Sequence, residues 1–435
     1  MTDLLLRRAW VDDAVHDDVL VTVRDGRFAR VEPRATAVPG AERVEGLTIP
    51  GLANAHSHAF HRALRGRTQR DRGTFWTWRE QMYAVADRLD PDSYRALARA
   101  VFREMVAAGI TTVGEFHYLH HQPDGTPYDD PNAMGLALVE AARDAGLRIS
   151  LLDTCYVSAG FGAPPEGVQR RYSDGDAEAW AVRAALLPSA PGVVHGAAVH
   201  SVRAVPRDQL AVVAAAASGR PLHVHLSEQV AENDACLAAY GVTPTRVLAD
   251  AGVLGPLTSA VHATHLTPED VRLLGGSGTQ ACFCPTTERD LADGIGPSRR
   301  LREAGSPLTL GSDSHAVVDL FEEMRAVELD ERLASQQRGH WTAGRLLAAA
   351  TADGHASLGL PDAGRIAVGQ RADLVTLDTA SPRTAGTGAD EQTVVFAATA
   401  ADVTRVMVDG RVVVRQGDAE DIGRELDRVI GDLWR

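Results

Sequence analysis

Short apolar runs alternate along most of the chain with longer segments that have the periodicity of amphipathic helices. Eight apolar runs recur between residues 48 and 315, separated by stretches rich in Ala, Leu and Arg. Apolar strands that are buried on both faces and connected by helices are typical of a parallel sheet. Eight strand–helix units predict an α/β fold, a (β/α)8 barrel of the TIM type. The expected strands are Thr48–His58, Thr111–Tyr118, Arg148–Tyr156, Val193–His200, Pro221–Glu228, Ser259–Leu266, Gln280–Thr287 and Leu308–His315.

Proline marks the expected start of several helices between these strands. A proline in the first turn is favourable, because the backbone N–H that it lacks has no partner in that turn. The clearest helices are expected at Pro91–Ala108, Pro131–Ala145, Pro206–Ala217 and Leu320–Leu333.

Both ends of the chain have a β pattern instead. Asp25-Gly26 and Asp409-Gly410 are dipeptides that favour tight hairpin turns. Neither end is long enough to bury a core by itself. We therefore expect residues 1–47 and 360–435 to form one small β-sandwich domain, with a barrel of residues 48–359 inserted between them. Further strands are expected at Val19–Val23, Arg27–Val31, Ala372–Leu377, Val394–Phe396, Val403–Val408 and Arg411–Val414.

The charge balance excludes several classes of function. The 435 residues include 44 basic and 58 acidic side chains, a formal net charge of −14. This charge repels phosphate backbones and anionic membranes, so nucleic acid is not an expected partner. No lysine occurs in the sequence, and every basic side chain counted is arginine. Schiff-base chemistry, pyridoxal phosphate anchoring, phosphate-binding P-loops and metal pairs bridged by a carboxylated lysine are therefore excluded.

Hydrophobicity and cysteine content lead us to expect a cytoplasmic protein. No run of about twenty apolar residues is present to cross a membrane, and the acidic N-terminus does not resemble a secretory signal. With 4 cysteines over the whole chain, a disulfide framework is not expected.

Histidines and carboxylates gather where the expected barrel strands end. His56 and His58 lie two residues apart at the end of the first strand, so their side chains point the same way and can bind one cation. An HxH pair alone is weak support, because a chain with 16 histidines readily contains one by chance. Its place at the C-terminal end of a strand, where barrel enzymes have their sites, favours a functional interpretation.

Similar residues end three other strands. Glu228 follows His225 at the end of the fifth strand, His262 lies in the sixth, and Asp313 ends the eighth. Polar side chains at the ends of several barrel strands converge on one pocket. Three neutral imidazoles and one carboxylate form a site for a single zinc or iron(II) ion with room for water. The predicted ligands are His56, His58, His225 and Asp313, with His223 as the alternative to His225 on the same strand face.

Together these motifs resemble the amidohydrolase superfamily, in its mononuclear deaminase branch. The pattern is HxH after the first strand, His-x-x-Glu after the fifth, His in the sixth and Asp in the eighth. Within that superfamily, four stretches are similar to the subgroup that hydrolyses N-formimino-L-glutamate to N-formyl-L-glutamate and ammonia in histidine degradation. These stretches are PGLANAHSHAFHRALRG, FWTWREQMY, EFHYLHH and VHSVRAV.

The resemblance implies a mechanism and a set of site residues. One divalent ion per chain, zinc or alternatively iron, would be held by the four predicted ligands, and hydroxide on that ion would attack the formimino carbon. Asp313 would accept the first proton of the water, and Glu228 and His262 would take part in proton transfer. A small dianionic substrate and a homodimer are also implied. The implied substrate-binding residues are His61, Arg79, Tyr118, His200 and Arg203.

One position departs from the family pattern. His61 stands where the subgroup is expected to have glutamine. An imidazole reaches less far than an amide and can ionise, so the contact near a substrate carboxylate is in question.

Structural interpretations of several residues stay open at this point. Arg79 could stack on neighbouring aromatic side chains at the surface, and Tyr118 and His200 could be core residues. Cys282 and Cys284 are expected to be buried thiols, because no second cysteine pair is present to complete a zinc site.

Other functions also fit the metal pattern. A deaminase of a ring such as guanine, cytosine or an adenosine derivative would share the ligands but would need stacking groups in place of paired arginines. A non-catalytic metal-binding scaffold has no need of Glu228 and His262. Spacing alone does not exclude a metal-dependent lyase or isomerase.

Overall fold

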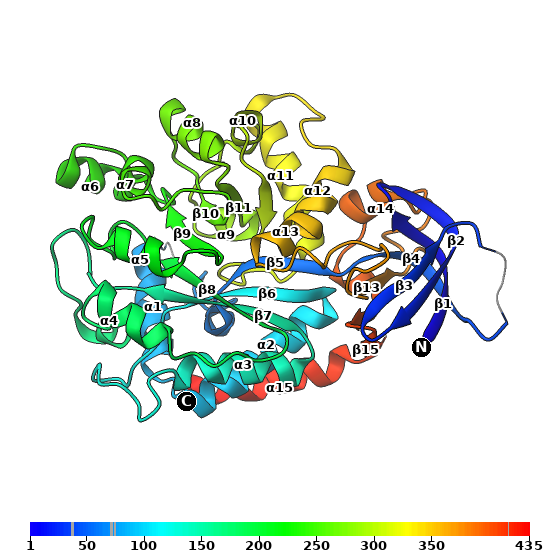
Figure 1. Ribbon diagram of the computed structural model, residues 1–435, viewed down its shortest axis with the longest axis horizontal. Helices are drawn as coiled ribbons and strands as arrows, with labels where there is room; N and C mark the ends of the chain where they lie inside the picture. The colour runs from blue at the N-terminus through cyan, green and yellow to red at the C-terminus, as the bar shows by residue number, and fades with distance from the viewer. Residues whose placement is uncertain (36–38, 70–72, 74, 416) are drawn as a thin grey trace.

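The computed structural model describes residues 1–435 apart from 36–38, 70–72, 74 and 416. Eight parallel strands form a barrel that lies beside a second, mixed sheet (Figure 1). The barrel strands pair in chain order, and a bridge between Ser57 and Asp313 brings the end of the last strand to the first. The predicted (β/α)8 barrel is thereby confirmed. Its strands are β5 Leu52–Ser57, β6 Ile110–His117, β7 Arg148–Cys155, β8 Val193–Val199, β9 Leu222–Leu226, β10 Thr258–His262, β11 Gln280–Phe283 and β12 Leu308–Leu310.

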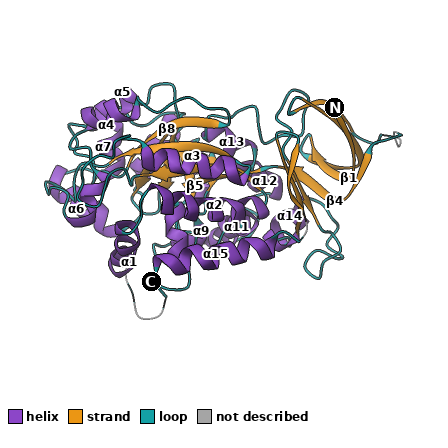
Figure 2. Cartoon of the chain, turned by 90° about the horizontal axis from the view of Figure 1, so that it is seen from below, coloured by secondary structure: helices purple, strands orange, loops and turns teal. Residues whose placement is uncertain are grey.

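Helices cover the outside of the barrel (Figure 2). No helix in the described part of the chain is both long enough and apolar enough to span a membrane. The α-helices are α1 Phe75–Asp87, α2 Pro91–Ala107, α3 Ala133–Ala145, α4 Ala177–Ala184, α5 Leu210–Ala216, α6 Val230–Tyr240, α7 Pro244–Asp250, α8 Pro268–Ser277, α9 Pro285–Asp290, α10 Ser298–Ala304, α11 Leu320–Ser335, α12 Ala343–Ala350, α13 Ala352–Ser357, α14 Glu391–Phe396 and α15 Ala419–Leu433, and the 3-10 helices are η1 Ala59–Leu64, η2 Gly167–Tyr172 and η3 Ala400–Asp402.

The proline signals locate helix starts with different accuracy. Helix α2 begins at Pro91 as predicted, after Asp90 accepts a hydrogen bond from the Ser93 amide at 2.8 Å. Helix α3 begins two residues after Pro131, and α5 begins four residues after Pro206. Pro206 instead begins a turn in which its carbonyl accepts a hydrogen bond from the Gln209 amide at 2.9 Å. In these two cases proline precedes the helix and does not begin it.

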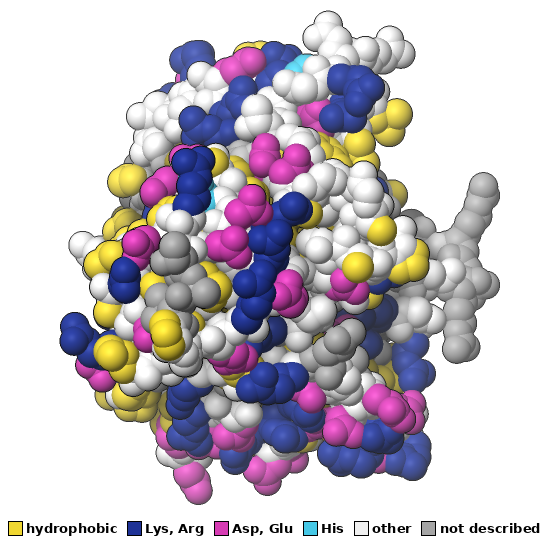
Figure 3. Space-filling model, turned by 90° about the vertical axis from the view of Figure 1, so that its right-hand side faces the viewer, with side chains coloured by type: hydrophobic (Ala, Val, Ile, Leu, Met, Phe, Trp, Pro, Cys, Tyr) yellow, Lys and Arg dark blue, Asp and Glu magenta, His cyan; other side chains and the backbone are white. Residues whose placement is uncertain are grey.

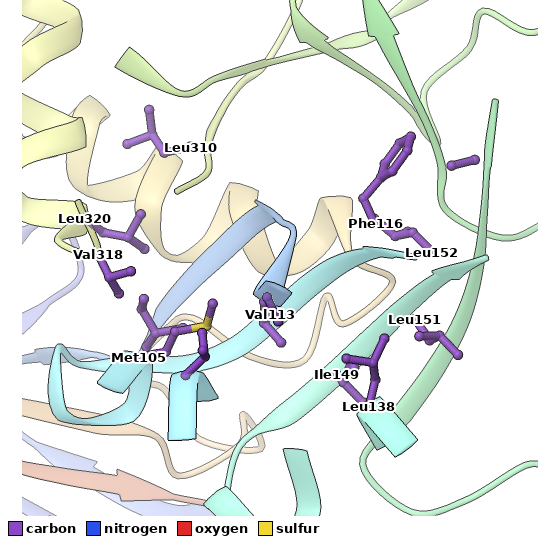
Figure 4. Packing of buried hydrophobic residues seen from close by; sticks show 14 of the residues in the cluster. Met105, Val113, Phe116, Leu138, Ile149, Leu151, Leu152, Leu310, Val318 and Leu320 are labelled. Atoms are coloured by element: carbon purple, nitrogen blue, oxygen red, sulfur yellow. The ribbon is translucent and has the colours of Figure 1, made fainter. Parts of the chain in front are cut away.

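Apolar side chains fill the space between the barrel and its helices. Met105 of α2 lies near Val113 of β6, and Leu138 of α3 lies against Ile149 and Leu151 of β7 (Figure 4). Every residue of β6 and β7 is buried. Because both faces are buried, the side chains of these strands do not divide into a core face and a solvent face, and polar residues such as Glu115 and Asp153 are buried as well.

The two ends of the chain share one mixed sheet of seven strands. Its order is β15-β14-β13-β4-β1-β2-β3, so β13 from the C-terminal part pairs directly with β4 from the N-terminal part. The expected partnership of the two ends is therefore confirmed. The strands are β1 Thr2–Val11, β2 Ala14–Arg24, β3 Arg27–Glu32, β4 Glu42–Pro50, β13 Leu374–Leu377, β14 Val403–Val408 and β15 Arg411–Arg415.

Both predicted hairpin turns are present in this sheet. Asp25 and Gly26 have φ angles of 51° and 76°, and Asp409 and Gly410 have 46° and 73°. Positive φ at both central residues is the conformation that Asp-Gly favours. The two turns contact each other, since a Cβ atom on Gly26 would lie 3.3 Å from the Asp409 carbonyl oxygen. The sheet thus curls until its two hairpins meet.

Arginine and acidic side chains lie next to one another on the face of the molecule that this sheet forms (Figure 3). Arg7 pairs with Asp18 at 3.3 Å, and Arg8 pairs with Asp17 at 3.1 Å. Exposed pairs of this kind contribute little stability each. They keep this surface polar, with positive and negative charges next to one another.

The first predicted barrel strand was too long. Residues Thr48 to Pro50 belong to β4 of the mixed sheet, where the Thr48 hydroxyl lies 3.1 Å from that of Thr376. The barrel strand starts only at Leu52, after Gly51. One continuous apolar run therefore serves two sheets, and the hydrophobic pattern alone does not show where the chain passes from one to the other.

Two further segments differ from the β pattern expected near the C-terminus. Val394–Phe396, expected as a strand, is the end of helix α14. Asp390 caps this helix by accepting hydrogen bonds from the amides of Gln392 and Thr393 at 3.0 and 3.1 Å, which outweighs the β propensity of a short Val-Val-Phe run. Helix α15 lies along α2 of the barrel (Figures 1 and 2), although its residues were expected in the small domain.

Candidate active site

A cavity lies at the C-terminal ends of the barrel strands. Its walls come from residues at or just after the ends of seven strands, together with one face of α1 and Tyr172 of η2. This is the end of the barrel at which barrel enzymes place their chemistry. The lining residues are His58, His61, Trp78, Arg79, Met82, Tyr83, Tyr118, Tyr156, Tyr172, His200, Arg203, His225, Glu228, His262, Leu291 and Asp313.

Four predicted ligands meet at the base of this cavity. His56, His58, His225 and Asp313 each offer one nitrogen or oxygen, and these four atoms lie within 4.8 Å of one another. Asp313 Oδ1 lies 3.2 Å from His56 Nε2 and 3.3 Å from His58 Nε2. His225 Nε2 lies 3.1 Å from His56 Nε2. All four side chains are buried.

The hydrogen bonds behind two of these rings fix where their protons lie. His58 Nδ1 lies 2.9 Å from the Phe116 carbonyl oxygen, and His225 Nδ1 lies 3.0 Å from that of His200. A carbonyl oxygen only accepts, so each Nδ1 carries the hydrogen and each neutral ring directs a lone pair from Nε2. These two Nε2 atoms face each other at 3.3 Å. Two facing lone pairs repel, and a cation between them removes the repulsion.

The donor set fits a divalent metal ion. Three imidazole nitrogens and one carboxylate suit zinc or iron(II), and second hydrogen bonds that fix the imidazole tautomer are typical of histidine ligands. Burial by itself would raise the pKa of Asp313, but its contacts with His56 and His58 hold that pKa well below the usual range. The carboxylate is therefore ionised, as metal binding requires.

Backbone contacts between the first and last barrel strands position Asp313. The amides of Ser312 and Asp313 both donate to the His56 carbonyl at 3.0 Å, and the His58 amide donates to the Asp313 carbonyl at 3.2 Å. The side chain of Asn54 accepts from the Ser312 amide at 2.9 Å. Barrel closure thus brings ligands more than 250 positions apart in sequence together.

His223, the alternative ligand of the fifth strand, lies outside this cluster. Its ring is 6.4 Å from that of His56 and nearly parallel to it. Within the described part of the chain neither ring nitrogen has a hydrogen-bond partner. Burial lowers the pKa of His223 to about 3, so the ring is neutral. The geometry brings His225 into the cluster, and not His223.

His262 lies between carboxylates beside the metal cluster. Its Nε2 is 3.9 Å from Glu228 Oε1 and 3.9 Å from Asp313 Oδ2. Burial disfavours the protonated ring, but Glu228, Glu288 and Asp313 outweigh burial and hold the pKa of His262 well above its usual value. Burial raises the pKa of Glu228, which the His262 charge opposes. Glu228 and His262 thus lie close to each other beside the metal cluster.

The five predicted substrate-binding residues all line the cavity. His61 Nε2 lies 2.9 Å from the Tyr118 hydroxyl. The guanidinium of Arg79 lies 5.4 Å from the centre of the Tyr83 ring, and Arg203 Nε lies 3.7 Å from Glu232 Oε2. The structure brings these residues together, and the role of each stays a prediction.

Sequence reasoning missed several residues of the site. Glu288 contacts His262 from α9, Tyr83 lies on α1, and Tyr172 lies in the 3-10 helix η2. No local motif marks Glu288 or Tyr172, whereas Tyr83 is the last residue of the FWTWREQMY stretch. Tyr156 directly follows β7, so its strand-end position was a usable signal.

A second histidine cluster lies outside the barrel wall. His117, His120 and Asp153 also offer three atoms within 4.8 Å. Asp153, however, accepts hydrogen bonds from Arg183 at 2.8 and 2.9 Å, so its charge is already neutralised. A divalent ion there would lie next to the Arg183 cation, and the cluster therefore suits a structural role.

Comparison with known proteins agrees with the site. The amidohydrolase family model matches residues 47–413. A formimidoylglutamate deiminase of Pseudomonas aeruginosa is 40% identical over an alignment of 432 positions that covers 94% of each chain. A 5-methylthioadenosine/S-adenosylhomocysteine deaminase of Halobacterium salinarum is 30% identical over 92% of this chain and 88% of its own. The crystal structure of an amidohydrolase from Brucella melitensis superposes with a TM-score of 0.92 and 32% identity over 100% of both chains.

Proposed function

Because the chain belongs to the amidohydrolase family and is a hydrolase of carbon–nitrogen bonds, we propose that it converts N-formimino-L-glutamate and water to N-formyl-L-glutamate and ammonia. One observation carries the choice of substrate. Two arginines, Arg79 and Arg203, line the same cavity as the three-histidine, one-aspartate cluster. A substrate with two carboxylates matches two guanidiniums, which bind carboxylates in a bidentate manner. The relative named formimidoylglutamate deiminase supports the same assignment.

His56, His58, His225 and Asp313 would hold one divalent ion, which we propose to be zinc, with iron(II) as the alternative. When bound, such an ion supplies Lewis-acid activation of water, whose pKa zinc lowers to about 7. The rings of His58 and His225 are oriented for binding the ion, because the Phe116 and His200 carbonyls accept their Nδ1 hydrogens and leave each Nε2 as the ligand atom.

In the proposed reaction the water oxygen bonds to the formimino carbon, and the bond from that carbon to the terminal nitrogen breaks. Asp313 accepts the first proton of the attacking water. Glu228 takes the second proton and delivers it to the leaving nitrogen, which also receives the proton held by Asp313, so that the imino nitrogen departs as ammonia and the formyl group remains. Burial raises the pKa of Glu228, which suits a carboxyl group that must hold a proton between the two steps. His262 donates a hydrogen bond to the attacking oxygen.

Arg79 and Arg203 would bind the two substrate carboxylates, and Tyr118, His200 and His61 would orient the chain between them. The His61–Tyr118 contact of 2.9 Å gives His61 a route to act on the substrate through the tyrosine hydroxyl. This contact offers an explanation for a histidine at a position where glutamine is expected.

A ring deaminase is the second candidate. Trp78 and four tyrosines line the cavity and could stack on a planar ring. The relative named 5-methylthioadenosine/S-adenosylhomocysteine deaminase also shares the fold and the family.

Ammonia release distinguishes the two candidates. The zinc-loaded protein would be incubated separately with N-formimino-L-glutamate, 5-methylthioadenosine, guanine and cytosine. We expect ammonia and N-formyl-L-glutamate in equal amounts from the first substrate and no ammonia from the others. Turnover of a ring substrate in preference to N-formimino-L-glutamate would replace the proposal with the ring-deaminase alternative.

A further inference from the structure

Gln169 of η2 lies behind the cavity wall and contacts two of its tyrosines. Its Nε2 is 3.1 Å from the Tyr83 hydroxyl and 2.8 Å from the Tyr156 hydroxyl. Its Oε1 is 3.2 Å from the amide nitrogen of Glu166. A backbone amide only donates, so the oxygen end of the Gln169 side chain must face Glu166. The nitrogen end therefore faces the two tyrosines.

The direction of these hydrogen bonds determines what the tyrosines can offer. An amide nitrogen donates and does not accept, so both phenolic oxygens act as acceptors toward Gln169. Each hydroxyl keeps its own hydrogen. No side chain or carbonyl in the described part of the chain accepts either hydrogen. Tyr156 is only 7% exposed, and both tyrosines line the cavity, so two hydroxyl donors are directed at whatever occupies it.

The surroundings of these hydroxyls favour an anion. The Arg79 guanidinium lies 5.4 Å from the centre of the Tyr83 ring, and Arg203 lines the same cavity. Burial raises the pKa of Tyr156 well above its usual value, so the phenol stays protonated and remains a donor. Two neutral donors beside the Arg79 guanidinium are complementary to one carboxylate.

The subsite is separated from the metal cluster by one imidazole ring. The Tyr156 ring lies 4.8 Å from the His200 ring, which lies 5.2 Å from that of His225. In a glutamate derivative the side-chain carboxylate is the group farthest from the formimino carbon. A site one ring away from the ligands suits that distal group.

We propose that Gln169 sets the hydroxyls of Tyr83 and Tyr156 as paired donors to the side-chain carboxylate of the substrate, which makes the pair a determinant of specificity. The identity of this carboxylate rests on the proposed function. Gln169 is a positioning residue, because it acts through the two tyrosines and does not line the cavity itself.

Three substitutions test the direction of the hydrogen bonds. Tyr83→Phe and Tyr156→Phe each remove one donor, and a hydrogen bond to a charged group is worth about a 10- to 100-fold change in KM. Gln169→Glu preserves shape but replaces the donating amide with a carboxylate that accepts both hydroxyl hydrogens. Both tyrosines would then direct lone pairs at the substrate carboxylate. We expect Gln169→Glu to raise KM at least as much as the Tyr83→Phe/Tyr156→Phe double variant.

Two comparisons separate this role from a general effect on folding. KM for N-formimino-glycine, which lacks the side-chain carboxylate, should stay within about twofold of wild type in every variant. Adding both Phe substitutions to Gln169→Glu should cause no further loss, since the hydroxyl hydrogens are already withdrawn. Tyr240→Phe is the matched control, because the Tyr240 hydroxyl contacts the Arg207 amide at 3.4 Å and lies outside the cavity.

Binding of glutarate, measured by calorimetry on the metal-loaded protein, tests the subsite without turnover. Weaker glutarate binding in Tyr156→Phe and Gln169→Glu, with no change in Tyr240→Phe, would support the subsite. This result would hold even if the wild-type protein hydrolysed no formimino compound. In that case the proposed function would fail and the subsite would stand. Glutarate affinity and KM within twofold of wild type in Tyr83→Phe, Tyr156→Phe and Gln169→Glu would overturn the inference. Equal losses with N-formimino-glycine would overturn it as well.

Discussion

Glu288 Oε1 lies 3.4 Å from Nδ1 of His262, on the side of the ring opposite the Nε2 atom that faces Glu228 and Asp313. The Cys284 amide donates to the same Glu288 oxygen at 2.9 Å and holds the carboxylate in place. A carboxylate behind an imidazole fixes the tautomer and favours the protonated ring.

We expect Glu288→Gln to lower the pKa of His262 and to reduce kcat about 10-fold, with bound metal unchanged. The measurement is a pH–rate profile at full metal loading. Glu323→Gln is the control, because Glu323 is also a buried carboxylate but accepts its hydrogen bond from the Thr286 amide at 3.0 Å. Identical pH–rate profiles for Glu288→Gln and wild type would show that Glu288 does not act on His262.

The protein should bind one divalent ion per chain. Four ligands converge on one point, and the lysine that would bridge a second ion is absent from the sequence. Elemental analysis of the purified protein should give one equivalent, and chelation should abolish activity. His225→Ala should lose the ion, whereas His120→Ala should keep it because the His117–His120–Asp153 cluster is neutralised by Arg183. Two tightly bound ions per chain would contradict this prediction.

Glu228→Gln should separate binding from chemistry. The amide keeps the size of the side chain but cannot carry a proton, so kcat should fall about 10²- to 10⁴-fold while metal and substrate still bind. If Glu228 instead only supported a ligand, metal affinity would fall about 10- to 100-fold and added zinc would restore turnover. Titrating the variant with zinc while following ammonia release decides between the two roles.

Arg79→Met and Arg203→Met should each reduce kcat/KM for the dianionic substrate. Loss of a charge-assisted bidentate contact corresponds to roughly 2 to 4 kcal/mol, or about 30- to 1000-fold. Metal content should not change, since neither arginine belongs to the metal cluster. Arg207→Met is a suitable control, because Arg207 pairs with Asp250 at 3.0 Å on the surface. Wild-type kcat/KM in either cavity variant would remove that arginine from the substrate site.

Acid should weaken the fold through the buried pair of Asp153 and Arg183. Burial alone would raise the pKa of Asp153, but Arg183 outweighs it and lowers that pKa to about 2. An unfolded aspartate has a pKa of about 3.9, so the stabilisation is complete above that value and is lost as pH falls toward 2. Asp153→Asn should lower the free energy of unfolding by about 3 kcal/mol at pH 7. This is a small loss for a broken buried ion pair, because Asp174 still contacts Arg183 at 2.8 Å.

Thermal unfolding at pH 7 and at pH 3 checks this prediction. The difference in Tm between Asp153→Asn and wild type should be smaller at pH 3, because protonation begins to remove the same charge from wild type. A difference that is constant with pH would mean that the substitution acts through packing and not through the carboxylate charge.

The barrel and the chemistry at its strand ends could be read from the sequence because both depend on local patterns. The barrel strands are short runs rich in apolar residues, and histidine or carboxylate side chains at their ends, such as His225 and Asp313, could be identified from the sequence. The amidohydrolase motif combines several such positions, and the family assignment followed from them. The same pattern could not predict where, between Thr48 and His58, the chain passes from the mixed sheet to the barrel. Residues buried in either sheet are equally apolar.

Tertiary structure decided which of the eligible side chains meet. His223 and His225 share a strand face and the same local signal, and only their height in the barrel relative to His56 brings one of them into the cluster. Glu288 and Gln169 carry no motif, because they act through contacts with residues 26 and 86 positions away. Helix α14 formed where Val394–Phe396 favoured a strand, since the Asp390 cap outweighed the intrinsic preference of three residues. The sequence thus determined which residue types occupy the ends of the strands, whereas the register and closure of the barrel decided which of them lie within contact distance.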